Sequence, residues 1–131
     1  MRVFVVPGED EEVQKALVTG LHEAGHEVVN DPFGAWRAAP LAQAERNVFL
    51  GAVDKMLEAE MLAADVSGES AAAGWCAAWF LAKGRLVVLT CRRDARASLT
   101  PMLAGNPSPW QKVVLFDAPG DLPAALGALL R

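Results

Sequence analysis

The chain has 131 residues, 53% of them hydrophobic and 21% charged, which favours one domain over residues 1–131 and excludes a disordered or collagen-like chain. The net charge of −4 argues against nucleic acid or an anionic membrane as a partner. No apolar run reaches the ~18 residues of a membrane span, and the two cysteines are too few for a disulfide framework. The N-terminal apolar run is too short for a secretion signal, so we expect a cytoplasmic protein.

Apolar periodicity alternates between strand-like and helix-like along the chain. The expected strands are Arg2–Val6, His26–Asn30, Glu60–Val66, Leu86–Cys91 and Lys112–Phe116. The expected helices are Glu9–Ala24, Leu41–Ala59, Ser70–Lys83, Ala95–Leu103 and Leu122–Leu130. Strict alternation predicts an α/β fold with a five-stranded parallel sheet that is covered by helices on both faces.

Two segments outside this alternation suggest further features. The stretch Pro32–Pro40 is rich in Pro, Gly and Ala, and we interpret it as a surface loop or lid. Its Trp36 could stack on a base or anchor the loop to the body of the domain. The helix Ala71–Ala82 is apolar nearly all round, so it must be buried on more than one face, and we expect a homodimer.

The run from His22 to His26 matches the H-E-x-x-H pattern of zinc proteases. That chemistry needs both histidines one turn apart on a continuing helix. Gly25 stands where the helical pattern stops, so the two imidazoles should point in unrelated directions. A zinc hydrolase built on these histidines is therefore only an alternative, and we expect no metal and no cofactor.

Binding sites in parallel sheets lie at the carboxyl ends of the strands, which directs attention to the segment from Ala59 to Cys76. Its pattern is a strand, a short Ser/Gly loop and a helix that begins near Ser70. A serine at this position caps the helix, whose first N–H groups could also bind an anion or a hydroxyl. An ordinary capped helix is the simpler interpretation of the same residues.

This segment resembles the nucleoside 2-deoxyribosyltransferase superfamily, nearest to its 2′-deoxynucleoside 5′-monophosphate N-glycosidase branch. The similarity runs without a gap from Glu60 to Cys76, and it extends more loosely to Gly105. It implies a doubly wound sheet of flavodoxin or Rossmann type, in the order 2-1-3-4-5. It also implies a homodimer that cleaves the bond between deoxyribose and base, with a glutamate nucleophile and an assisting aspartate. It also implies that hydroxyls and backbone N–H groups at the helix start hold a 5′-phosphate.

Compared residue by residue, this chain keeps the family's ligand-binding positions better than its catalytic positions. Ser70 matches the phosphate-binding serine, and Thr100 matches a hydroxyl contributed across the dimer. The nucleophile position is Cys76, and the position of the assisting aspartate is Ala52. The expected ligand-binding residues are Pro7, Gly8, Ser67, Ser70, Gly74 and Thr100. The candidate catalytic residues are Cys76 and Asp65.

Four carboxylates, Glu9 to Glu12, occupy the turn where the family has a glycine-rich loop containing an arginine. They would repel a phosphate unless Arg37, Arg92 or Arg93 folds over the site.

Because the binding positions are kept and the two catalytic carboxylates are lost, we expect a protein that binds a nucleoside or nucleotide-like small molecule with little or no glycosidase activity. The alternative is an active N-glycosidase or deoxyribosyltransferase that uses Asp65 or another carboxylate. A free cysteine such as Cys76 is more often a small buried side chain than a nucleophile.

Overall fold

The computed structural model describes residues 1–33, 42–68 and 70–130. The strands are β1 (Arg2–Val5), β2 (Glu27–Val28), β3 (Met61–Asp65), β4 (Leu86–Arg92) and β5 (Gln111–Phe116). The α-helices are α1 (Glu11–Glu23), α2 (Ala42–Glu58), α3 (Ala71–Ala82), α4 (Pro101–Ala104) and α5 (Leu122–Leu130), and the 3-10 helices are η1 (Arg93–Ser98) and η2 (Pro119–Asp121). Most of the predicted lid, including Trp36 and Arg37, lies outside the described residues.

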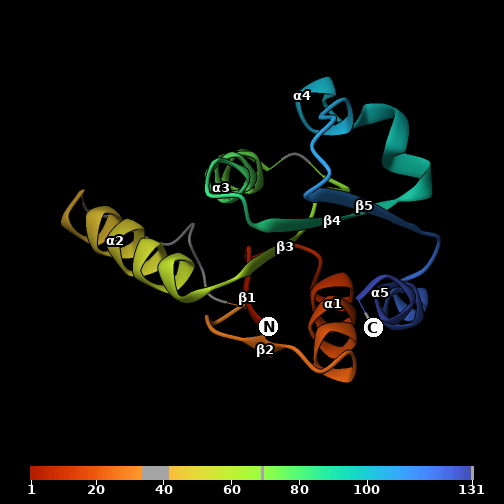
Figure 1. Cartoon of the computed structure of the whole chain (residues 1–131), viewed down its shortest axis with the longest axis horizontal. Helices are drawn as coiled ribbons and strands as arrows, with labels where there is room; N and C mark the ends of the chain where they lie inside the picture. The colour runs from red at the N-terminus through yellow and green to blue at the C-terminus, as the bar shows by residue number, and fades with distance from the viewer. Residues whose placement is uncertain (34–41, 69, 131) are drawn as a thin grey trace.

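The sheet is parallel throughout and has the order β2-β1-β3-β4-β5, so the predicted fold class and strand order are confirmed. Helices α1 and α5 lie side by side on one face, and α2 and α3 lie on the other (Figure 1). None of the helices in the described residues is both long and apolar enough to cross a membrane. With strands running in one direction, the carboxyl ends of β1, β3 and β4 meet at one edge, where ligands bind in such folds.

Alternate residues of the strands supply two separate hydrophobic cores. On one face, Val3, Ala63 and Val88 pack with Leu17 and Leu126, which come from α1 and α5. The core of the opposite face, beneath α2 and α3, includes Phe4, Leu62, Leu89, Met56, Cys76 and Phe80. Burial on both faces explains why β3 and β4 are apolar in nearly every position.

Gly20 allows α1 and α5 to approach closely. A Cβ at this position would lie 2.8 Å from Leu126 Cδ1 and 2.9 Å from the Cα of Pro123. Both neighbours belong to α5, and the Pro123 atom is backbone that cannot rotate away. A larger residue at position 20 would therefore force the two helices apart.

Two predicted elements differ from the structure in their extent. The second strand has only two residues, because the side chain of Asn30 takes over its pairing with β1: Asn30 accepts from Val5 N over 2.9 Å and donates to Val5 O over 2.8 Å. The helix predicted over Ala95–Leu103 is divided into η1 and α4. The division falls before Pro101, whose ring disfavours helical backbone at Thr100, where ψ is 137°.

Candidate functional site

A cavity of about 500 Å³ opens at the carboxyl ends of β1, β3 and β4. It lies between the start of α1 and the start of α3. Its lining residues are Pro7, Gly8, Glu9, Asp10, Val13, Gln14, Asp65, Ser67, Gly68, Ser70, Ala71, Ala72 and Arg92. The structure therefore brings together five of the residues proposed from the sequence, namely Pro7, Gly8, Asp65, Ser67 and Ser70.

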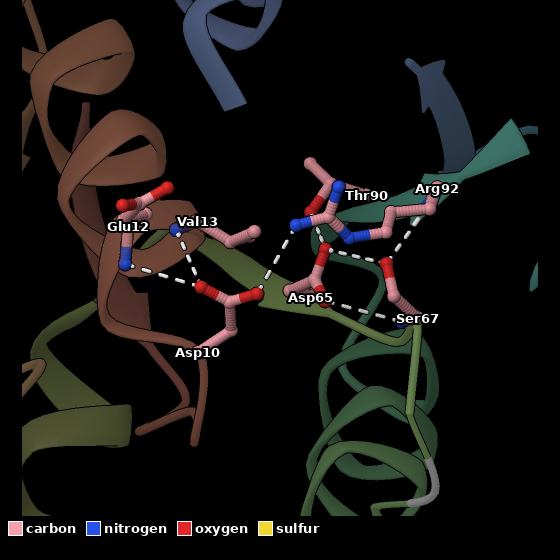
Figure 2. A network of polar contacts seen from close by, with 7 residues as sticks. All are labelled: Asp10, Glu12, Val13, Asp65, Ser67, Thr90 and Arg92. Atoms are coloured by element: carbon pink, nitrogen blue, oxygen red, sulfur yellow. Dashed lines mark hydrogen bonds and ion pairs between the residues drawn. The ribbon is translucent and has the colours of Figure 1, made fainter. Parts of the chain in front are cut away.

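Asp65 ends β3 and is held by hydrogen bonds on both carboxylate oxygens (Figure 2). Thr90 Oγ1 donates to Asp65 Oδ2 over 2.7 Å, and Ser67 Oγ donates to the same oxygen over 3.2 Å. The backbone N–H of Ser67 donates to Asp65 Oδ1 over 3.1 Å. Burial raises the pKa of Asp65 above its ordinary value, although these hydrogen bonds and the nearby Arg92 act in the opposite direction.

Ser67 connects the ends of β3 and β4. Its hydroxyl donates to Asp65 and accepts the backbone N–H of Arg92 over 2.7 Å. The hydroxyl proton is thus already used inside the protein. Ser67 shapes the wall of the cavity and has only an acceptor lone pair left for a ligand.

Asp10 and Arg92 form an ion pair between α1 and β4, with Arg92 Nη2 lying 3.1 Å from Asp10 Oδ2 (Figure 2). The other oxygen of Asp10 caps α1 and accepts the backbone N–H groups of Glu12 and Val13. The hydrogen bond from Val13, followed by that from Arg92, lowers the pKa of Asp10. Arg92 also lies over the ring of Phe116, with 5.5 Å between its guanidinium carbon and the ring centroid.

Ser70 caps α3, because its Oγ accepts the backbone N–H of Ala73 over 3.0 Å. The Ser70 hydroxyl proton has no acceptor among the described residues, so it remains able to donate to a ligand. Ser70 also lines a second cavity of about 480 Å³, together with Ser67, Gly68, Ser98 and Thr100. Within the single chain, Thr100 thus lines the same cavity as Ser70, and Ser67, Gly68 and Ser70 line both cavities.

Gly74, also proposed from the sequence, lies in the first turn of α3 and lines neither of these cavities. A Cβ at this position would meet no atom within 4 Å. No packing contact therefore requires a glycine at this position.

Cys76 and Ala52 both line a separate apolar groove of about 340 Å³ between α2 and α3. Cys76 is buried at 2% exposure, and burial raises the pKa of its thiol to about 12. A thiol with this pKa is protonated at neutral pH and is a poor nucleophile. Glu45 is the only carboxylate among the described residues that line the groove, and Phe49 and Trp75 form its outer rim.

The two histidines of the H-E-x-x-H run do not share a helix. Helix α1 ends at Glu23, and Gly25 turns the chain with φ +86° before His26. Within residues 1–33, 42–68 and 70–130, no three His, Cys, Asp or Glu side chains are grouped so that they could hold a metal ion.

The sequence interpretation missed Gln14, which is buried at 1% exposure beneath the cavity. Its Nε2 donates to Val6 O over 3.0 Å and to Pro32 O over 2.8 Å, so it joins α1 to the ends of β1 and of the segment after β2. Gly8 fits against its amide, since a Cβ there would lie 2.9 Å from Gln14 Oε1. The available signal was a polar residue at helical spacing with buried Leu17 and Leu21.

Comparisons with known proteins identify the fold but not the family. No protein-family model matches the chain, and no curated protein sequence matches it. Among solved structures, the Clostridium botulinum CMP N-glycosidase BcmB is similar, with a TM-score of 0.70 and 17% sequence identity over 99% of this chain and 100% of that one. The chain thus shares the α/β fold of that enzyme over 99% of its length.

Proposed function

We propose that this protein binds a nucleoside or nucleotide-like small molecule in the cavity beside Ser70 and has little or no N-glycosidase activity. Three observations support the binding part of the proposal. The cavity lies at the edge of the sheet where such folds bind ligands. Ser70 can donate a hydroxyl there, and BcmB, whose fold is similar, acts on CMP.

The observation that carries the inactive part is the chemistry of positions 52 and 76. Glycosidic cleavage with a covalent intermediate needs a nucleophile and an acid that assists the leaving group. By resemblance these would be a glutamate at position 76 and an aspartate at position 52. Ala52 has no ionisable group, and the Cys76 thiol remains protonated because it is buried among apolar side chains.

Blocking the cavity tests this proposal. Gly68 lines both cavities, has an ordinary φ, and its Cβ would enter open space, so Gly68→Leu should fold and fill the site. Gly120, which is exposed in η2, has equally open space, and Gly120→Leu is the matched control. Calorimetry with a panel of nucleosides and 5′-monophosphates should show binding to the original protein and the control, and at least tenfold weaker binding to Gly68→Leu. Chromatography of the same mixtures should show no free base.

Absence of binding to every compound in the panel would contradict the proposed ligand class. Sustained release of free base would contradict the inactive part and favour the second candidate, an active N-glycosidase. One observation favours this second candidate: Asp65 and Asp10 line the same cavity with pKa values displaced in opposite directions, as in an acid and base pair. If base is released, Asp65→Asn should abolish the release.

We also propose that the protein forms a homodimer through the outer surface of α2 and α3. Trp75 and Phe49 are 49% and 52% exposed, and their rings meet edge to face with centroids 5.6 Å apart. Leu50 adds to the exposed apolar surface of α2. Aromatic side chains gathered at the rim of an apolar groove are typical of a protein interface.

A further inference from the structure

Arg92 is the only cationic side chain among the described residues that line the cavity of about 500 Å³ between the starts of α1 and α3. Glu9, Asp10 and Asp65 supply carboxylates to the same cavity. Any phosphate that entered this cavity would need Arg92 as its charged partner. The guanidinium is already held on two sides. Phe116 lies under it, and the Asp10 carboxylate is 3.1 Å from Nη2.

The position of Asp10 has two consequences for a phosphorylated ligand. A phosphate would have to displace the Asp10 carboxylate from Arg92, and it would then lie beside that carboxylate with the same sign of charge. A nucleoside faces neither difficulty, because its hydroxyl groups donate hydrogen bonds that carboxylates accept. The partial positive charges at the starts of α1 and α3 are the remaining attraction for an anion, and at α1 the Asp10 carboxylate already offsets this charge.

We propose that Asp10 is a specificity-determining residue that makes the cavity selective for the uncharged nucleoside over its 5′-monophosphate. This inference rests on the proposed function. The two carboxylate oxygens of Asp10 have separate tasks: Oδ1 caps α1 and Oδ2 engages Arg92. The capping task can therefore be kept while the charge is removed. Asparagine caps helices as well as aspartate does, so Asp10→Asn should fold normally.

Glu12→Gln is the matched control. It removes one negative charge from the same turn of α1, and the Glu12 side chain does not line the cavity. Arg92→Gln and the double variant that combines Asp10→Asn with Arg92→Gln complete a double-mutant cycle. The cycle shows whether the effect of Asp10 depends on Arg92.

Calorimetry measures the dissociation constants of a nucleoside and its 5′-monophosphate for each protein. We expect the original protein to bind the nucleoside at least tenfold more tightly than its 5′-monophosphate. The ratio of the two dissociation constants should fall about tenfold in Asp10→Asn, mostly because the monophosphate binds more tightly. In Glu12→Gln this ratio should change less than twofold. In the Arg92→Gln background, the Asp10→Asn change should have little effect on the ratio.

The outcomes separate this inference from the proposed function. Binding with a ratio that Asp10→Asn leaves unchanged, or that Glu12→Gln changes equally, would overturn the role of Asp10 while the binding function stood. A monophosphate that binds the original protein more tightly than its nucleoside would also overturn it. Failure of both compounds to bind any of the proteins would overturn the proposed function and this inference together.

Discussion

Asp65 is a carboxyl group whose charge is disfavoured by burial and favoured by hydrogen bonds from Thr90 and Ser67. Burial has the larger effect, so the pKa of Asp65 is raised in the folded protein. The side chain nevertheless organises the site, because it positions Ser67, which in turn binds the backbone of Arg92. Asp65 therefore helps to connect the ends of β3 and β4, and its carboxyl group stays protonated to a higher pH than usual.

A raised folded pKa predicts a pH-dependent contribution to stability. Between the unfolded pKa of about 3.9 and the raised folded value, the folded protein keeps a proton that the unfolded chain has released. The free energy of unfolding should therefore fall as the pH rises through this window, by at most about 1.4 kcal/mol per pH unit for one group.

Asp65→Asn lacks this titration, so urea unfolding of both proteins across the acid range measures it directly. The stability of the original protein relative to the variant should be greatest below the unfolded pKa and should decline until the folded pKa is passed. A relative stability that instead increased with pH would mean that the hydrogen bonds outweigh burial.

At the scale of the element, α3 begins at a capped end and continues through a nearly uniform apolar sequence. The Ser70 hydroxyl accepts the N–H of Ala73, and no acidic residue stands in the first turn to add to this cap. Helix α3 carries Cys76 and Phe80 into the core, so its first turn supports both the fold and the wall of the cavity.

Removing this cap should destabilise the protein measurably. Ser70→Ala should lower the free energy of unfolding by about 1 kcal/mol, and Ser70→Asn should recover most of the loss because asparagine also caps helices. Ser98→Ala is a suitable control, since Ser98 lines the second cavity without capping α3. Chemical denaturation of the three variants compares them. Equal stability of Ser70→Ala and the original protein would show that water replaces the cap without cost.

At the scale of the molecule, the two faces of the sheet are covered differently. Gly20 brings α1 and α5 into close contact on one face. On the other face, an apolar groove lies between α2 and α3, and it is lined in part by the half-exposed side chains of Trp75 and Phe49. Exposed apolar surface of this kind is the physical reason for expecting a second copy there.

If the homodimer forms through α2 and α3, a charge introduced on that face should weaken self-association, whereas a charge introduced on the α5 face should not. Trp75→Glu should weaken self-association more than tenfold, because it replaces an aromatic anchor with a charge that the interface would bury. Leu129→Glu, on the exposed surface of α5 at 38% exposure, should leave it unchanged. Sedimentation equilibrium measures both. A protein that is monomeric at all concentrations, or equal effects of the two substitutions, would contradict the interface.

The fold class, the order of the elements and the edge of the sheet where the cavity lies could all be predicted from the sequence. Periodicity reports these features because each strand or helix must bury its own apolar side chains. Local chemistry also predicted the Ser70 cap and the end of α1 before His26.

Which distant residues meet depends on the folded arrangement of the chain. Arg92 and Asp10 are 82 positions apart, and Asp65 and Thr90 are 25 apart, so no local pattern could pair them. The burial of Gln14 and the length of β2 also depended on contacts between segments. A side chain's partners and its pKa arise from groups brought together by folding, and periodicity along the chain contains no information about those distances.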